Sequence, residues 1–151
     1  MRRYLVVANQ TLGGQELSDR LLGLMKDGPC AFHFVVPVTQ TDVTGYGVDA
    51  AWAPPVVHEG YEVARLLAEG RLKHELARLR EAGAEADGEV VDAMPIDHVR
   101  ELVGRVTFDE VIVSTLPHRV SRWLRLDLPH RIKRATDLPM EHVISSAGPS
   151  L

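Results

Sequence analysis

The amino-acid sequence predicts an α/β fold, a single doubly wound, Rossmann-like sheet of five parallel strands with helices on both faces. Short apolar runs alternate with longer stretches of helical periodicity in the order βαβαβαβαβ. Right-handed crossovers between such strands give a parallel sheet, for which we expect the strand order 3-2-1-4-5. The 151 residues suit one domain, and 45% hydrophobic with 25% charged residues is ordinary globular composition.

The chain begins with a strand and an amphipathic helix. Residues 4–8 form a short, continuous apolar run, which is typical of a buried strand. After the turn-like residues 9–14, apolar side chains fall on one helical face at Leu17, Leu21, Leu24 and Met25. Residues 27–29 (Asp-Gly-Pro) end this helix, and residues 31–36 form a second strand that Pro37 closes.

A long connection follows the second strand. Residues 38–58 show no periodicity and contain Tyr46 and Trp52 among glycines and prolines. A connection of this length in a compact domain is usually functional or disordered. Because it leaves the carboxyl end of a strand, it could fold over that edge of the sheet with Trp52 or Tyr46 as a lid.

Two helices and two strands are predicted beyond this loop. Apolar residues near helical spacing indicate a long helix over about 59–82, with Gly83 as its C-cap. A strand over 85–92 comes next, although an Asp-Gly pair interrupts it. Pro95 in a first turn opens a short helix, and the apolar run 110–114 forms the fourth strand.

The last part of the chain predicts a broken helix and a final strand. Residues 120–135 have helical spacing, but Pro129 lies inside this stretch, so we expect a break near Asp127. Residues 140–145 make the last strand. The predicted domain therefore spans 1–146, and residues 147–151 are expected to be a flexible tail.

Several segments match those of a known family in order and spacing. They are Asp109-Glu110-Val111-Ile112-Val113, residues 121–124 with 129–132, and Leu138-Pro139-Met140. With the element order, they give the chain a resemblance to the universal stress proteins over nearly its whole length. The resemblance implies a five-stranded parallel sheet, a role in stress response and a homodimer formed through the last strand.

The same resemblance implies a loss of the family's ATP-phosphate loop. ATP-binding members carry G-x2-G-x9-G-[S/T], whose glycines let the backbone approach phosphates. The corresponding residues here are Val113, Leu116, Leu126 and Asp127. We expect the Asp127 carboxylate to cap the following helix and to repel a phosphate at that place. The resemblance therefore implies no ATP binding in the usual way, and we expect no cofactor.

A ligand crevice is predicted between the first and fourth strands, where the expected strand order reverses. Asn9 stands where ATP-binding relatives usually have an aspartate, and its amide can still read a base or ribose. The candidate ligand-binding residues are Asn9, Gln10, Thr11, Ser114, Thr115, His118, Arg119 and Arg122. The alternative is that the polar residues after these strands only cap strand ends and helix starts.

The sequence offers little for catalysis. Ser114 or Thr115 with His118 is the one local hydroxyl–imidazole pair, but it has no G-x-S-x-G elbow and no partner acid. We expect His33 to be a neutral core histidine and Asp92 to stand alone at a strand end. Residues 11–14 (Thr-Leu-Gly-Gly) form either a weak phosphate cradle or a flexible turn.

Neither metal binding nor nucleic-acid binding is favoured. The seven histidines include no H-x3-H pair, so we expect no metal site. Residues 118–134 carry six basic side chains against one acid, whereas 1–117 carry 11 basic and 18 acidic ones. This stretch could meet an anion or nucleic acid, or be the solvated face of a helix. The net charge of −4 and the absence of interleaved aromatic residues argue against nucleic acid.

The redox and membrane context also follow from composition. A single cysteine, Cys30, excludes an internal disulfide and suits a reducing cytosol, and we expect a buried inert thiol. No apolar run is long enough to span a membrane. We therefore expect a cytoplasmic protein without a membrane partner.

Three functions remain open at this point. The leading interpretation is a non-catalytic, homodimeric binding or regulatory domain that can hold a small-molecule ligand. The second is a protein or hydrolase that binds a nucleotide or small anion in an altered pocket between the first and fourth strands. The third is an interaction scaffold that docks an acidic partner on the basic helix 118–134.

Overall fold

The structure, a computed structural model, describes residues 1–38, 54–92, 95–117, 123 and 127–148. Five strands form one sheet in the order β3-β2-β1-β4-β5, and every neighbouring pair is parallel. The predicted strand order is confirmed. The strands are β1 (Arg2–Val7), β2 (Cys30–Pro37), β3 (Glu85–Val91), β4 (Glu110–Thr115) and β5 (Met140–Ile144).

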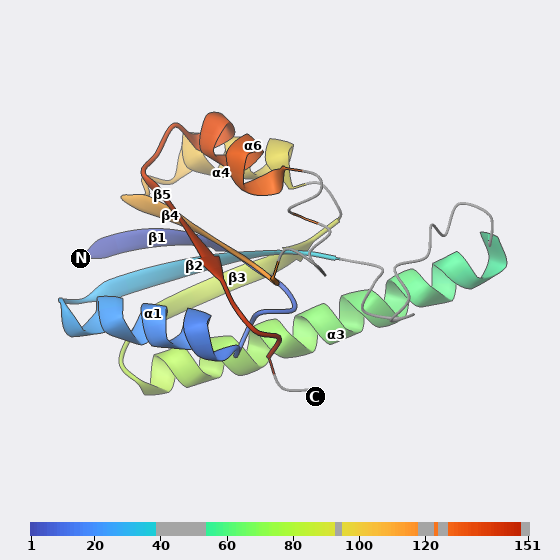
Figure 1. Ribbon diagram of the computed structural model, residues 1–151, viewed down its shortest axis with the longest axis horizontal. Helices are drawn as coiled ribbons and strands as arrows, with labels where there is room; N and C mark the ends of the chain where they lie inside the picture. The colour runs from blue at the N-terminus through green and yellow to red at the C-terminus, as the bar shows by residue number, and fades with distance from the viewer. Residues whose placement is uncertain (39–53, 93–94, 118–122, 124–126, 149–151) are drawn as a thin grey trace.

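Helices cover both faces of this sheet, as predicted (Figure 1). On one face lie α1 (Gln15–Lys26) and α3 (Pro54–Glu81), and on the other lie α4 (Ile96–Arg105) and α6 (Leu128–Thr136). The α3 helix begins at Pro54, so the last part of the predicted loop 38–58 is helical. The remainder of that loop, with Tyr46 and Trp52, lies outside the described residues.

The core has two halves because parallel strands bury both of their faces. On the α1–α3 face, Val6, Phe32 and Phe34 pack against Leu17 and Leu21 of the α1 helix. On the other face, strand residues pack against the apolar sides of α4 and α6, the buried members being Leu5, Val7, Val35, Val99, Leu102, Val111, Val113, Leu128 and Ile132. Successive residues of a strand point to opposite faces, so each short apolar run contributes to both halves.

Two helices, α1 and α3, end close to the glycines at which the sequence predicts their ends. The α1 helix stops at Lys26, and Gly28 beyond it has a φ of 149°, which an L side chain rarely adopts. The long α3 helix stops at Glu81, where Gly83 with a φ of 103° lets the chain turn into β3. None of the described helices is apolar over the length that a membrane crossing needs.

Candidate functional site

The carboxyl ends of β1 and β4 lie side by side at the point where strand order reverses, which is where open α/β sheets bind ligands. Asn9 lies two residues beyond the end of β1 and is buried. Its Nδ2 donates a hydrogen bond to the Pro37 carbonyl at 2.8 Å, and its Oδ1 accepts one from Nη1 of Arg71 at 3.0 Å. The Asn9 amide is therefore held at both ends in one orientation.

Arg71 is a site residue that the sequence did not reveal. It lies on α3, 62 residues from Asn9, and its side chain reaches the carboxyl edge of the sheet. Helical spacing alone places it on a long helix among other charged residues. The fold brings its guanidinium group to the edge that carries Asn9.

Two buried hydroxyls lie at the same edge. Thr11 and Ser114 are 2% and 1% exposed, and neither hydroxyl has a hydrogen-bond partner within the described residues. An unsatisfied buried hydroxyl costs about 1–3 kcal/mol. Such atoms recur at binding sites because a ligand can satisfy them. Gln10, between Asn9 and Thr11, is half-buried.

Thr115 has a partner that the sequence did not suggest. Its Oγ1 lies 2.7 Å from Nε2 of His142 on β5. Burial lowers the pKa of the His142 imidazole, so the ring is neutral near pH 7. Its Nε2 can then accept a hydrogen bond from the Thr115 hydroxyl. His118, the predicted partner, lies outside the described residues, as do Arg119 and Arg122.

Ser114 and Thr115 do not act together. Adjacent residues of a strand point to opposite faces, so Ser114 lies on the α1–α3 side and Thr115 on the α4–α6 side. Within the described residues, no hydroxyl–histidine–carboxylate chain forms around Thr115. This geometry supplies a fixed hydrogen bond between β4 and β5.

The four positions of the altered phosphate loop are partly described. Val113 is fully buried inside β4, and Leu116 is half-buried just beyond it. Leu126 lies outside the described residues.

The prediction that Asp127 caps the next helix with its carboxylate is wrong. Asp127 occupies the N-cap of α6, but its side chain makes no capping hydrogen bond. Its backbone is left-handed, with a φ of 55°, whereas a capping residue needs an extended backbone. Pro129 at the second helical position also lacks the N–H that a cap would bind.

The glycine turn before α1 is closed by the chain's own C-terminal segment. Ser145 Oγ accepts the Leu17 N–H at 3.2 Å, and Ser146 Oγ accepts the Gln15 N–H at 3.4 Å. A Cβ on Gly14 would lie 2.1 Å from the Ser146 carbonyl oxygen. These contacts use the amides that a phosphate would need, so the hypothesis of a cradle at residues 11–14 is not supported.

The same segment binds Glu16. The backbone N–H of Ser146 and the hydroxyls of Ser145 and Ser146 donate to one Glu16 oxygen at 2.9–3.1 Å. These bonds lower the pKa of the Glu16 carboxyl to about 2. Gly148, within the segment expected to be a flexible tail, donates its N–H to the Gln10 carbonyl.

One further expectation is wrong: His33 is not a core histidine, because its side chain is 21% exposed, and its Nδ1 lies 2.7 Å from a carboxylate oxygen of Asp87. Asp92, expected to have no second carboxylate beside it, has partners of other kinds, because the Tyr61 hydroxyl donates to it and Arg65 lies 3.6 Å away. In both cases the partner lies on another element, which periodicity does not reveal. Cys30 is buried as expected, and burial raises the pKa of its thiol.

The part of the chain that the structure describes holds no group of three or more histidine, cysteine or acidic side chains arranged for a metal ion. Nor does the carboxyl edge hold a carboxylate pair for acid–base work among these residues. What it offers is hydrogen bonding: an oriented amide, a guanidinium group and buried hydroxyls. Such groups bind and orient a polar ligand.

No family model matches the sequence, and no curated protein matches it. Solved structures match in fold. A universal stress protein family protein from Arabidopsis thaliana with AMP bound has a TM-score of 0.59 at 11% identity, and the match covers 97% of this chain and 94% of that one. A universal stress protein in complex with cAMP has a TM-score of 0.55 at 14% identity, covering 96% and 98%.

A third match is the universal stress protein from Archaeoglobus fulgidus in complex with dAMP, with a TM-score of 0.52 at 11% identity, covering 95% of this chain and 98% of that one. All three matches extend over nearly the whole chain. Together with the observed strand order, they confirm the resemblance in architecture. The chain has the fold of the universal stress proteins, with a sequence far from those of these solved members.

Proposed function

We propose that this chain is a diverged universal stress protein that binds a small polar ligand at the carboxyl edge between β1 and β4, without catalysing a reaction. The observation that carries the proposal is the fixed Asn9–Arg71 pair beside two buried hydroxyls without partners. Such groups gathered where strand order reverses are what a binding pocket needs.

The ligand class that we propose is a nucleoside monophosphate. Asn9 orients the Arg71 guanidinium group, which suits a single phosphate, and the buried hydroxyls of Thr11 and Ser114 suit the polar groups of a nucleoside. Three solved proteins of this fold hold AMP, cAMP or dAMP, which supports this class.

We also propose that ATP does not bind in the family's usual way. Val113 and Leu116 carry side chains where the phosphate loop has glycines. The exposed Asp127 adds a carboxylate at the amino end of α6, where a phosphate would otherwise be attracted. A monophosphate has no further phosphates to place there, so these changes affect it less.

Variants on one helix test the proposal. Arg71→Gln should weaken AMP binding by about tenfold, because it removes a charge-assisted hydrogen bond. Lys73→Gln is the matched control, since Lys73 is exposed on the same helix and loses the same charge. The rise in melting temperature on adding AMP measures binding by each of the two variants. Equal effects of the two variants, or no AMP response in the unaltered chain, would reject the site.

We further propose a cytoplasmic homodimer that pairs through β5. This strand lies at the edge of the sheet and pairs with β4 alone within the described residues, and its Ile144 side chain is 52% exposed. Ile144→Lys should shift the mass measured by light scattering from dimer to monomer. Val63→Lys, at an exposed apolar residue on α3, should leave the mass unchanged.

A further inference from the structure

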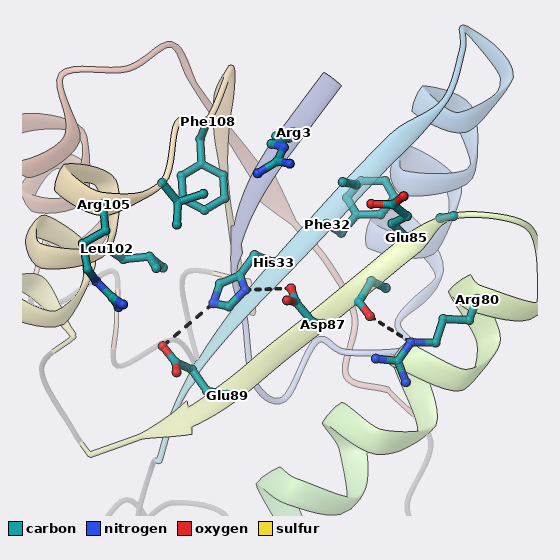
Figure 2. Close-up of a pocket in the computed structure, with 14 residues that line it drawn as sticks. Arg3, Phe32, His33, Arg80, Glu85, Asp87, Glu89, Leu102, Arg105 and Phe108 are labelled. Carbon is teal, nitrogen blue, oxygen red and sulfur yellow. Dashed lines mark hydrogen bonds and ion pairs between the residues drawn. The ribbon is translucent and has the colours of Figure 1, made fainter. Parts of the chain in front are cut away.

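A cavity lies at the opposite edge of the sheet from the proposed nucleotide site. It has a volume of about 770 Å³ and is formed mainly by β1, β2 and β3 together with α4 and the residues before β4. Figure 2 shows its lining residues on β2, β3 and α4. Ligand pockets commonly have volumes of about 300–1,000 Å³.

The floor of this cavity presents hydrogen-bond acceptors. His33 lies between Asp87 and Glu89 in Figure 2, and its Nδ1 is 2.7 Å from Asp87 Oδ1. In neutral histidine, the Nδ1–H donates to Asp87, which leaves a lone pair on Nε2. That Nε2 is buried, makes no hydrogen bond within the described residues and lies 3.8 Å from Glu89 Oε1. In this tautomer, the gap between His33 Nε2 and Glu89 Oε1 therefore contains two hydrogen-bond acceptors and no donor.

Glu89 also contacts Nε2 of His98 on α4, so the carboxylate links the floor to the helix wall. The Asp87 and Glu89 side chains are 72% and 39% exposed, which leaves both open to a ligand. Two carboxylates and an imidazole lone pair favour a cationic donor such as an ammonium group over a neutral one.

Two arginines line the cavity at separate places, and the Arg105 guanidinium group lies on the Glu89 side. Arg3 and Arg105 lie on either side of Phe108 in Figure 2. The Arg3 guanidinium group has no ion pair or hydrogen bond within the described residues, and Arg105 has one long contact, 3.8 Å to Glu101. Guanidinium groups bind carboxylates through parallel hydrogen bonds. Apolar side chains of Leu102, Val106 and Phe108 complete the wall.

We propose that this cavity binds a small zwitterion of the amino-acid class. Its ammonium group fills the gap between His33 Nε2 and Glu89, its carboxylate meets Arg105, and an apolar side chain packs on the α4 wall. A ligand with one charge leaves either the acceptors or the guanidinium group unmatched. A zwitterion matches both without adding net charge to the site.

Titration of the ¹⁵N-labelled full chain with L-leucine, N-acetyl-L-leucine and L-leucinamide tests this directly. The two derivatives each lack one of the two charges. L-leucine should shift amide resonances of β2, β3 and α4, and each derivative should bind about tenfold more weakly. No shift with L-leucine at millimolar concentration, or equal binding of all three, would overturn the proposal.

Two variants assign the contacts. Arg105→Gln should weaken L-leucine binding by about tenfold. Arg100→Gln is the matched control, because Arg100 lies on the same helix, is equally exposed at 62% and does not line the cavity. Equal losses in both variants would overturn the assignment. Ser114→Ala should weaken AMP binding and leave L-leucine binding unchanged. This variant therefore tests the two proposed sites independently.

Discussion

Glu16 fixes the C-terminal segment to the start of α1 through hydrogen bonds from Ser145 and Ser146. The backbone N–H of Ser146 contributes most to lowering the pKa of the Glu16 carboxyl to about 2. The unfolded chain has the ordinary value of 4.5, so the carboxylate stabilises the fold above pH 4.5. That contribution is lost as pH falls from 4.5 to about 2.

Glu16→Gln should therefore lower the unfolding temperature at pH 7, because the amide cannot accept these bonds as a carboxylate does. The difference from the unaltered chain should shrink as pH falls through this window and vanish near pH 2. Glu81→Gln, at an exposed acid at the end of α3, is the control and should change little. A difference that is constant with pH would contradict this account of Glu16.

His142 provides a second test at the scale of one side chain. Burial lowers the pKa of its imidazole below the ordinary value of 6.5, because the charged ring is poorly solvated. Protonation then favours the unfolded chain, so His142 makes the fold less stable as pH falls below 6.5. NMR titration of the His142 ring should give a pKa below 6.5, and a value above it would contradict the described environment.

The Thr115 hydroxyl is the partner of that ring, at 2.7 Å. Thr115→Val keeps the shape of the side chain but leaves His142 Nε2 without this donor. The free energy of unfolding should fall by about 1 kcal/mol, measured by urea denaturation at pH 7. Thr107→Val, at an exposed residue, is the control and should stay within about 0.5 kcal/mol of the unaltered chain.

Individual site residues were only partly predictable. Asn9 and Ser114 could be placed at the carboxyl edge because each ends a recognisable apolar run. Arg71 and His142 could not, because their contacts depend on how α3 and β5 lie against distant parts of the chain. Long-range contacts of this kind leave no local pattern in a sequence.

Among the elements, glycines give the sharpest test of packing. Gly88 of β3 faces the Phe34 side chain on β2, and a Cβ at Gly88 would lie 2.8 Å from the Phe34 Cβ. Gly88→Ala should therefore destabilise the chain by about 1–3 kcal/mol through overpacking. Gly23 of α1 has no atom within 4 Å of such a Cβ. Gly23→Ala should stabilise by about 0.5–1 kcal/mol, measured by denaturant unfolding. The same sign for both substitutions would contradict this packing.

The elements themselves were largely predictable from periodicity and from glycine and proline. The differences arise where local signals compete. The α3 helix starts at Pro54, because proline fits the first turn of a helix although the preceding sequence resembles a loop. The predicted helix break near Asp127 agrees with the start of α6 at Leu128. However, the left-handed backbone of Asp127 and the presence of Pro129 prevent side-chain capping.

For the whole molecule, the strand order places two different sets of polar side chains at opposite edges of one sheet. The carboxyl edge carries the Asn9–Arg71 pair and the buried hydroxyls, and the amino edge carries the His33 cavity. The alternation of strands and helices predicts a parallel, doubly wound sheet, but such sheets occur in more than one strand order, so the order 3-2-1-4-5 was an expectation that the structure then confirmed. The cavity was not, because it forms where α4 leaves β3 uncovered, and helix placement over a sheet is not a local property.

We propose that this chain binds a nucleoside monophosphate but not ATP in the family's usual way. Isothermal titration calorimetry of the full chain with AMP, and separately with ATP and Mg²⁺, compares the two affinities. AMP should bind with an affinity about tenfold or more above that for ATP. If ATP binds as tightly as AMP, or more tightly, the proposal is wrong.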